Sequence, residues 1–207
     1  MELKEFALLK KYGISPIPYF IAKDEKTAIE AAEKLGYPVA LKIISPQASH
    51  KTEVGGVKIN IKNHVGVKLA FREFNEAIRT HDLNISGFLV QKMARKGIEL
   101  IIGGKKDAQF GHMIILGFGG VYVEVFKDIT ARLCPITEQD VEEMINELKA
   151  HPLIRGVRGQ KGVNIKTLKE IMLKVSKMLI KEDLKELDIN PIIFDDKGAD
   201  VVDVRFI

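Results

Sequence analysis

Residues 37–61, YPVALKIISPQASHKTEVGGVKINI, contain two strand-like segments from which the fold class can be predicted. Its first part, residues 38–44, is an apolar run with the length of a buried strand, and its last part, residues 55–61, alternates apolar and polar side chains as a half-exposed strand does. The loop between them contains His50 and leads into the pair Gly55–Gly56. Two strands joined by a polar loop with glycines predict a sheet whose connecting loop can approach a ligand closely.

Strand and helix patterns alternate on both sides of this stretch. They predict a strand at 17–22, a helix at 27–35, a helix at 67–78 and a strand at 87–93. Asp24 is a suitable N-cap for the first of these helices, and Gly36 follows its last apolar residue, as is typical of a helix C-terminus. We therefore expect residues 21–90 to form one lobe of the order βαββαβ, preceded by an N-terminal helix and strand entry in residues 1–20.

The second half of the chain continues the alternation. The predicted elements are strands at 98–104, 111–120 and 129–136, a helix opened by Thr137, a helix with Leu168, Met172, Val175 and Leu179 on one face, and strands at 184–194 and 199–207. Asp140 stands three residues after Thr137, which is a variant of the capping box. The fold class is therefore α/β, or α+β with mixed sheets, and residues 91–207 form a second lobe. We expect the two lobes to clasp a cleft.

Composition and charge restrict the class of protein. The chain has 207 residues, of which 46% are hydrophobic and 29% charged, and its formal net charge is +4. The basic residues are scattered without a basic tail or a nucleic-acid-binding motif, so we expect no nucleic-acid partner. The sequence contains no apolar run of about 18 residues, and its single cysteine, Cys134, cannot form an internal disulfide or a cysteine-based zinc site. We expect a cytoplasmic protein with no membrane partner.

Lys42 lies inside the apolar strand at 38–44, where an ammonium group needs an anion or an escape to solvent. One interpretation is a lysine whose long side chain reaches solvent from a strand. The other is a lysine directed at nucleotide phosphates. Gly55 and Gly56 favour the second interpretation, because backbone amides without a neighbouring Cβ can approach phosphate oxygens. On these residues alone both interpretations stay open.

The last two predicted strands place oxygen ligands side by side. If their hairpin centres on the middle of the turn DDKG, Asn190 lies directly opposite Asp203, with Cβ atoms about 5 Å apart. Asp188 shares their face because side chains two residues apart on a strand point the same way. Such oxygens are the ligands that Mg²⁺ prefers, and phosphates and water complete its octahedron. The alternative is a solvated polar face on an edge strand, which Pro191 favours.

The connection between the two predicted lobes has features of a nucleotide site. Its segment QKMA can offer backbone N–H and C=O groups to an adenine edge and comprises Gln91, Lys92, Met93 and Ala94. Glu99 opens the following strand, and its carboxylate can accept hydrogen bonds from ribose hydroxyls. His50 by itself is ambiguous, because a loop histidine is usually a solvated surface residue.

Five blocks of sequence, taken in order along the chain, resemble one protein family. They are YPVALKIISPQASHKTEVGGVKINI, VQKMARKGIELIIGGKKDAQFGHMIILGFGG, KDITARLCPI, GVRGQKG and LDINPII. In this order and at near-matching spacing they are similar to the β subunits of the ADP-forming acetyl-CoA synthetases, or acetate–CoA ligases (ADP-forming). The ATP-grasp module of that family is related to the one in succinyl-CoA synthetase. The resemblance covers essentially the whole chain and implies an ATP-grasp fold.

The resemblance implies a role for each candidate residue. The matches are Lys42 with the phosphate-binding lysine, Gln91 and Ala94 with the adenine hinge, Glu99 with the ribose-side carboxylate, and Asn190 of DINP and Asp203 of VVDV with the ligands of Mg²⁺. Asp188 departs from the pattern, because the related succinyl enzymes have a glutamate in its place. Whether Asp188 assists as a ligand or steadies a phosphohistidine therefore stays open.

His50 matches the histidine of the segment SxxxxHKTxxGGV, which accepts a phosphoryl group transiently in this family. A neutral imidazole is a good nucleophile near neutral pH, and its phosphoramidate can pass the group onward in either direction. Lys51, Gly55 and Gly56 would offset charge on the equatorial oxygens of the transferring group. The resemblance thus favours a working histidine.

The resemblance also implies a partner. No segment of the sequence resembles a CoA-binding module, which in this family belongs to an α subunit or to a fused N-terminal half. The expected protein is then the nucleotide-binding part of an α2β2-type hetero-oligomer that uses Mg²⁺ with ADP or ATP. The assembled enzyme would convert acyl-CoA, ADP and phosphate into carboxylate, CoA and ATP through acyl phosphate and phosphohistidine intermediates.

Two other functions share part of this pattern. An ATP-grasp carboxylate–amine ligase would use Lys42, Glu99 and the metal pair but not His50. A degenerate ATP-grasp module would sense nucleotide for a partner without catalysis. The sequence does not distinguish ADP from GDP, and it does not reveal the carboxylate.

Overall fold

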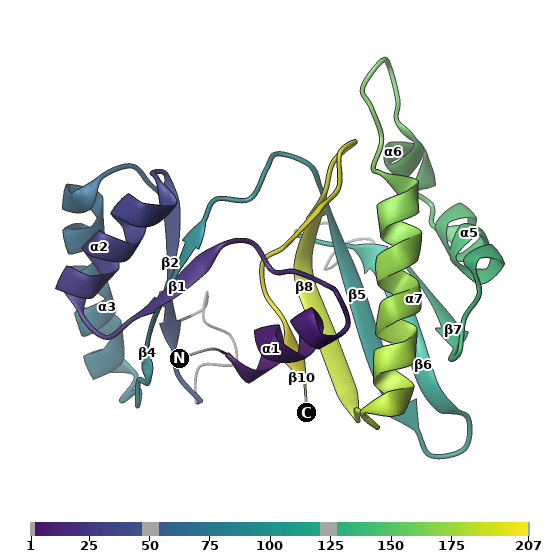
Figure 1. The fold of residues 1–207 in the computed structure, drawn as a ribbon, viewed down its shortest axis with the longest axis horizontal. Helices are drawn as coiled ribbons and strands as arrows, with labels where there is room; N and C mark the ends of the chain where they lie inside the picture. The colour runs from purple at the N-terminus through teal and green to yellow at the C-terminus, as the bar shows by residue number, and fades with distance from the viewer. Residues whose placement is uncertain (1–2, 47–53, 121–127, 207) are drawn as a thin grey trace. The chain divides into compact units, whose positions relative to one another are not determined.

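The computed structural model describes residues 3–46, 54–120 and 128–206 (Figure 1). Within these ranges the chain divides into two compact units. The first unit contains residues 17–93, and the second contains residues 3–16 together with 94–206. The N-terminal helix, which the sequence prediction set apart with residues 1–20, thus groups with the second unit. The sequence-based boundary after residue 90 and the observed boundary after Met93 differ by three residues.

The first unit has the element order predicted from the sequence. Its elements are β1 (Tyr19–Ala22), α2 (Glu25–Leu35), β2 (Val39–Ile44), β3 (Val57–Ile61), α3 (His64–Thr80) and β4 (Gly87–Lys92). The strands form an antiparallel sheet in the order β1-β4-β2-β3. The predicted βαββαβ order is therefore confirmed.

The helix ends of the first unit follow from local chemistry. The Asp24 carboxylate accepts a hydrogen bond from the Thr27 amide, and the Thr27 hydroxyl in turn accepts one from the Asp24 amide, which completes a capping box. Gly36 ends α2 with a φ of 78°, a left-handed conformation that glycine adopts without strain. Asn63, which the sequence analysis did not identify as a cap, accepts a hydrogen bond from the Gly66 amide at the start of α3.

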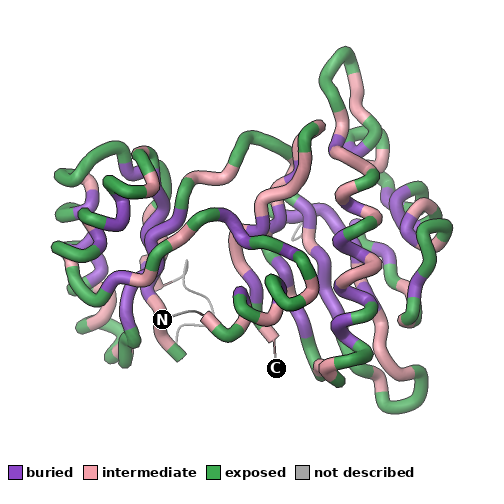
Figure 2. The backbone as a smooth tube through the Cα atoms, in the orientation of Figure 1, coloured by how far each residue is buried: buried purple, intermediate pink, exposed green. Residues whose placement is uncertain are grey.

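Three phenylalanines hold α3 against the sheet of the first unit. The ring centroids of Phe71 and Phe88 lie 4.4 Å apart, and those of Phe74 and Phe88 lie 5.9 Å apart. All three side chains are buried in a cluster that also contains Leu41 and Val90. Figure 2 shows that burial in this unit follows the strands and the sheet-facing sides of its helices.

One detail of the predicted pattern in the first unit is wrong. The alternation predicted for residues 55–61 implies that Ile59 faces inward together with Ile61, but the Ile59 side chain is 66% exposed. Val39 pairs with Ile61 whereas Leu41 pairs with Lys58, so β3 contains one more residue than β2 over this span. Asn60 has a φ of 59° at this bulge. Because a bulge inserts a residue, the period of two is interrupted and Ile59 faces solvent.

The second unit combines a larger sheet with four helices among the described residues. Its elements are α1 (Lys4–Lys11), β5 (Ile98–Asp107), β6 (Gly111–Phe118), β7 (Ile129–Leu133), α5 (Glu138–Glu147), α6 (His151–Arg155), α7 (Ile165–Lys181), β8 (Glu186–Phe194), β9 (Ala199–Val201) and β10 (Arg205–Phe206). The strand order is β10-β8-β5-β6-β7, and β9 also pairs with β8. The short helix α6 was not predicted, and the predicted strand at 199–207 is interrupted between β9 and β10.

One face of the larger sheet packs against α7 (Figure 1). The predicted apolar stripe of this helix is confirmed, since Leu168, Met172, Val175 and Leu179 are all buried. On β5 the residues that face α7 are Leu100, Ile102 and Gly104, because a Cβ on Gly104 would lie 2.4 Å from Leu179. Glu99, Ile101 and Gly103 therefore point to the opposite face of the sheet.

The predicted register of the last hairpin is confirmed. Ile193 pairs with Asp200, Phe194 pairs with Ala199, and the Asn190 amide donates a hydrogen bond of 3.2 Å to the Asp203 carbonyl. Against β5, however, β8 shifts register between Ile189 and Ile192, so that strand β8 bulges at Asn190 and Pro191. The bulge lets Leu187 and Ile189 on one side of it, and Ile192 and Phe194 on the other, all face the core.

Packing of α7 on the sheet can be tested at two adjacent glycines. Gly104→Ala should lower the free energy of unfolding by about 1–3 kcal/mol, because the new methyl group would overlap the buried side chain of Leu179. Gly103→Ala is the matched control, since a Cβ there would lie 3.5 Å from Ile115, an ordinary contact. Urea denaturation followed by circular dichroism measures both, and equal losses in the two variants would contradict the assigned faces.

Candidate functional site

Lys42 and Gln91 lie on the same face of the first unit's sheet. Their neighbours Leu41, Ile43 and Val90 pack with α2 and α3, so side chains one residue away along each strand point to the opposite face. On that face Lys42 pairs with Leu89, and Gln91 pairs with Ala40. The two predicted side chains are therefore diagonal neighbours on adjacent strands.

Both side chains are buried, although both are polar. Lys42 is 5% exposed and Gln91 is 0% exposed. A lysine in such a position does not have the solvent access that the snorkelling interpretation requires. A buried ammonium group is stable only beside polar or anionic groups, so this position suits recognition of an anion.

Gly55 and Gly56 lie immediately before β3, beside the strand that carries Lys42. The Gly56 carbonyl accepts a hydrogen bond of 2.9 Å from the Ile43 amide, and Lys42 pairs with Val57. Gly55 has a φ of 70°, and a Cβ placed on it would meet nothing within 4 Å. His50 and Lys51 of the preceding loop lie outside the described residues.

The segment QKMA spans the boundary between the units. Gln91 and Lys92 end β4, Met93 is the last residue of the first unit, and Ala94 is the first residue of the second unit after the boundary. The Met93 sulfur accepts a hydrogen bond of 3.4 Å from the Asn60 amide. The bulge in β3 thus contacts this segment within the first unit.

Glu99 lies on the face of the second sheet that points away from α7. Its backbone carbonyl accepts a hydrogen bond of 2.7 Å from the Gly119 amide. A Cβ on Gly120, whose φ is 68°, would lie 2.8 Å from the Glu99 Oε2 atom. The end of β6 therefore approaches the Glu99 side chain closely because these two residues are glycines.

Asp188, Asn190 and Asp203 lie on the same face as Glu99. Asp188 pairs with Gly103 of β5 and with Arg205 of β10, and the Asp203 carboxylate accepts a hydrogen bond of 3.1 Å from the Val204 amide. Burial raises the pKa of Asp188, while Arg205, whose guanidinium lies 3.6 Å away, opposes that shift. The structure thus brings these three predicted side chains to one face of one sheet.

The donor set of this cluster fits a magnesium ion bound together with a nucleotide. Among the described residues no group of three or more His, Cys, Asp or Glu side chains is placed to hold a metal by itself. Asn190 and Asp203 provide an amide and a carboxylate oxygen from adjacent strands, which is the incomplete shell that Mg²⁺ commonly takes from protein when phosphates supply the remainder.

The structure also contains features unrelated to these predicted residues. A hollow of about 580 Å³ lies between α1 and α7 and is lined by Lys11, Tyr12, Lys174, Lys177, Lys181 and Glu182. Burial and the Glu182 carboxylate raise the pKa of Tyr12 to about 12. None of the predicted site residues lines this hollow. In the part of the chain that the structure describes, no helix is long and apolar enough to cross a membrane.

Comparison with known proteins places this geometry in a family. A model of the ATP-grasp domain matches residues 1–207. The β subunit of acetate–CoA ligase (ADP-forming) I from Pyrococcus furiosus is 43% identical over 100% of this chain and 89% of that subunit. The chain belongs to the ATP-grasp family, with the β subunits of ADP-forming acetate–CoA ligases. The expected fold is therefore confirmed.

Two solved structures of the same family come from Ca. Korarchaeum cryptofilum. A dinucleotide-forming acetyl-coenzyme A synthetase 1 in complex with coenzyme A, Ca-AMPCP and HgCl⁺ matches with a TM-score of 0.92 and 41% identity, covering 97% of this chain and 89% of that one. A second form with coenzyme A and Mg-AMPPCP, whose phosphohistidine segment points towards the nucleotide-binding site, matches with a TM-score of 0.81 and 40% identity, covering 96% and 87%.

Sequence analysis missed one polar cluster of this ATP-grasp chain. Arg95, the residue after Ala94, contacts Asp195 and Asp200 of the β8–β9 hairpin. About 100 positions separate these partners along the chain, and no periodicity relates residues at that distance. The sequence offers one signal for them, which is their location. Arg95 directly follows the QKMA segment, Asp195 is the first residue of the turn DDKG, and Asp200 lies just after that turn.

The approach of Gly120 to Glu99 can be tested by stability. Gly120→Ala should lower the free energy of unfolding by about 1–2 kcal/mol, because a residue with a Cβ is strained at its left-handed φ of 68°. The end of the exposed, flexible Glu99 side chain can move away from the new methyl group, so this contact should add little. Gly111→Ala, whose φ is 80° and whose Cβ would meet nothing within 4 Å, should therefore cost about the same. Thermal or urea unfolding measures both variants, and a clearly larger loss in Gly120→Ala would show that the Glu99 side chain is held in place.

Proposed function

We propose that this chain is the nucleotide-binding β subunit of an ADP-forming acyl-CoA synthetase that acts on acetyl-CoA. The observation that carries the proposal is the 43% identity to the Pyrococcus furiosus β subunit over the full length of this chain. The enzyme is an acid–thiol ligase, and the role of this subunit is to exchange a phosphoryl group with ADP or ATP.

The first unit supplies residues for the nucleotide. Lys42 carries a buried ammonium group suited to the phosphates, and the neighbouring backbone at Gly55 leaves room for phosphate oxygens. Gly56, the next residue, is proposed to offer its backbone amide to the same phosphates. Gln91, Lys92, Met93 and Ala94 form the adenine-binding segment through their backbone groups and the apolar Met93 side chain.

The second unit supplies the carboxylate side of the site. Glu99 accepts hydrogen bonds from the ribose hydroxyls, and Asn190 and Asp203 are ligands of the Mg²⁺ that accompanies the nucleotide. When bound, this ion neutralises charge on the phosphates and fixes their orientation. Asp188, held near Arg205 and with a raised pKa, is a further candidate ligand.

His50 is the proposed nucleophile. In the direction of ATP use, the lone pair of one imidazole nitrogen forms a bond to the γ-phosphorus, the bond from that phosphorus to the bridging oxygen breaks, and ADP leaves with the electron pair. The second imidazole nitrogen releases its proton to solvent. In the direction of ATP synthesis the same bonds form and break in reverse.

The partner is a CoA-binding α subunit. The relative from Pyrococcus furiosus is named as a β subunit, which supports assembly with a second kind of chain, and we propose an α2β2 hetero-oligomer. The assembled enzyme converts acetyl-CoA, ADP and phosphate into acetate, CoA and ATP through acetyl phosphate and phosphohistidine.

Asn190→Ala and Asp203→Ala should each weaken binding of ADP in the presence of magnesium by about tenfold, because each removes one ligand of the ion. Binding without magnesium should change little. Isothermal titration calorimetry with and without the ion measures both, with Asp183→Ala as an exposed aspartate control in the same unit. If both variants keep the magnesium dependence of the wild type, these residues are not its ligands.

His50→Asn should leave ADP binding intact but reduce phosphoryl transfer about a thousandfold or more, because it removes the only proposed nucleophile. Two quantities are measured. One is the amount of acid-labile phosphoryl label on this chain after incubation with γ-labelled ATP and the α subunit, and the other is the rate of ATP synthesis. His81→Asn, at the C-terminus of α3, is the control. Full label on the His50 variant would make that residue a spectator.

The isolated chain should bind ADP with magnesium yet turn over acetyl-CoA only after an α subunit is added. We expect phosphate-dependent ATP synthesis to appear on mixing and to saturate with the second subunit. Acetyl-CoA turnover by this chain alone would refute the division of labour, whereas an absence of nucleotide binding would refute the proposed function itself.

A further inference from the structure

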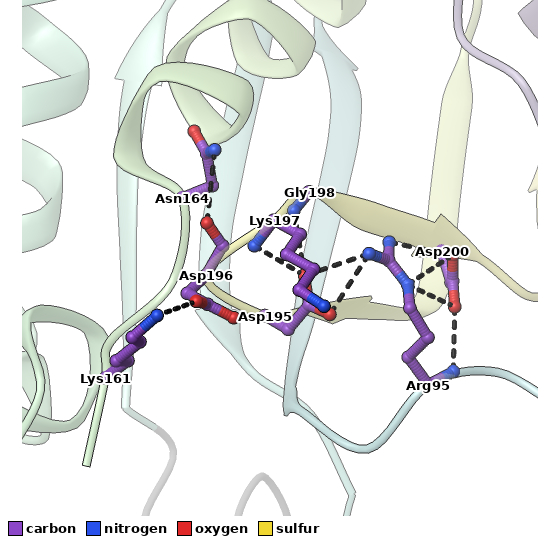
Figure 3. Close-up of polar contacts among 8 residues, drawn as sticks. All are labelled: Arg95, Lys161, Asn164, Asp195, Asp196, Lys197, Gly198 and Asp200. Carbon is purple, nitrogen blue, oxygen red and sulfur yellow. Dashed lines mark hydrogen bonds and ion pairs between the residues drawn. The ribbon is translucent and has the colours of Figure 1, made fainter.

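Arg95 and Asp200 form a multiple contact within the second unit (Figure 3). The Arg95 amide donates a hydrogen bond of 2.8 Å to Asp200 Oδ2, its Nη2 atom donates one of 3.0 Å to Oδ1, and its Nε atom lies 3.2 Å and 3.3 Å from the two oxygens. Asp200 thus contacts both the backbone and the side chain of Arg95. These hydrogen bonds raise the pKa of the Arg95 guanidinium above its ordinary value.

The same guanidinium reaches the turn of the hairpin. Its Nη1 atom donates a hydrogen bond of 3.1 Å to Asp195 Oδ1, which also accepts from the amides of Lys197 and Gly198 at 2.9 Å and 2.8 Å. One carboxylate therefore closes the turn and binds Arg95. Figure 3 shows Arg95 approaching the β8–β9 hairpin from the side opposite Lys161.

Both chain connections between the units are attached to β9. Within the described residues the chain passes between the units after Pro16 and after Met93. Pro16 forms an isolated parallel bridge with Val201, and Arg95, two residues beyond the second crossing, binds Asp200. Asp200 and Val201, which are adjacent in β9, thus each contact one of the two connections where it enters the second unit.

This strand belongs to the hairpin with the proposed magnesium ligands. Asp200 pairs with Ile193, and the same register continues to the Asn190–Asp203 contact. Arg95 directly follows Ala94, the last residue of the proposed adenine-binding segment. One side chain therefore connects the backbone beside the adenine segment to the strand pair that presents Asn190 and Asp203.

We propose that Arg95 is a positioning residue, which through Asp200 and Asp195 holds the end of the adenine-binding segment at a fixed place on the magnesium-binding hairpin. The inference rests on the proposed function. Its chemistry is that of the guanidinium fork, whose donors fix two partners at once in a plane, whereas a lysine ammonium cannot reproduce this geometry. The Arg95 side chain is 42% exposed, so the ion pair contributes orientation more than stability.

Arg95→Gln and Asp200→Asn are the variants that test it, and Arg132→Gln is the matched control. Arg132 is also paired with a carboxylate in the second unit, that of Glu147, but lies on β7. Hydrogen–deuterium exchange should speed up in peptides that cover residues 94–100 and 195–204 of Arg95→Gln. In Arg132→Gln these peptides should exchange as in the wild type. Unchanged exchange in both test variants would overturn the anchoring, whether or not nucleotide binds.

Calorimetry with ADP and magnesium then tests the consequence for the site. Arg95→Gln should weaken binding about tenfold, because small displacements of positioned groups have large effects. Asp200→Asn should weaken binding less, since an asparagine oxygen can still accept a hydrogen bond from the Arg95 amide. In the double variant, the factor by which ADP affinity falls should be smaller than the product of the two single-variant factors. Arg95→Lys should recover little of the affinity.

The outcomes separate the two proposals. Wild-type affinity in Arg95→Gln, with faster exchange, would show that the anchor does not serve the nucleotide site and would overturn the positioning role. Failure of the wild-type chain to bind ADP would instead refute the proposed function, and with it any role for the anchor in nucleotide binding. If Arg132→Gln lost as much affinity for ADP as Arg95→Gln, the inference would also be overturned, because equal losses would indicate a general loss of structure.

Discussion

The carboxylate of Asp195 closes the turn between β8 and β9, and much of the second unit depends on that turn. By accepting from the amides of Lys197 and Gly198 it determines which residues of the two strands face each other. Because side chains alternate along a strand, a slip of one residue in the pairing would turn Asn190 or Asp203 to the opposite face of the sheet. The position of Asn190 opposite Asp203 is therefore a consequence of turn chemistry five residues away.

The two faces of the second unit's sheet differ in composition: one is apolar and packed, and the other is polar. The face that packs on α7 is apolar and depends on close contact, as the approach of Leu179 to Gly104 illustrates. The other face carries Glu99, Asp188 and Asn190, groups that would be costly in a core. The bulge at Asn190 and Pro191 allows one strand to serve both purposes, since it restores inward apolar residues after a polar stretch.

Local patterns predicted most of the elements because their causes are local. Asp24 and Thr137 were identified as caps from the residues that follow them, and both form capping boxes. The stripe of α7 was recognisable because residues at helical spacing share a face. The exposure of Ile59 was not predicted, because the bulge that exposes it arises from pairing with β2, and a single strand contains no signal of its partner's register.

The order of the elements, the hairpin register and the residue types suited to phosphate, ribose and magnesium could all be predicted from local sequence patterns. These follow from short-range rules of turns, caps and periodicity, and from the chemistry of each side chain. Only the folded chain shows that Lys42 is buried, that the N-terminal helix belongs to the second unit, and that Arg95 binds Asp195 and Asp200. Such facts depend on segments far apart in the chain meeting in space, and pairing between distant segments has no period that a sequence can display.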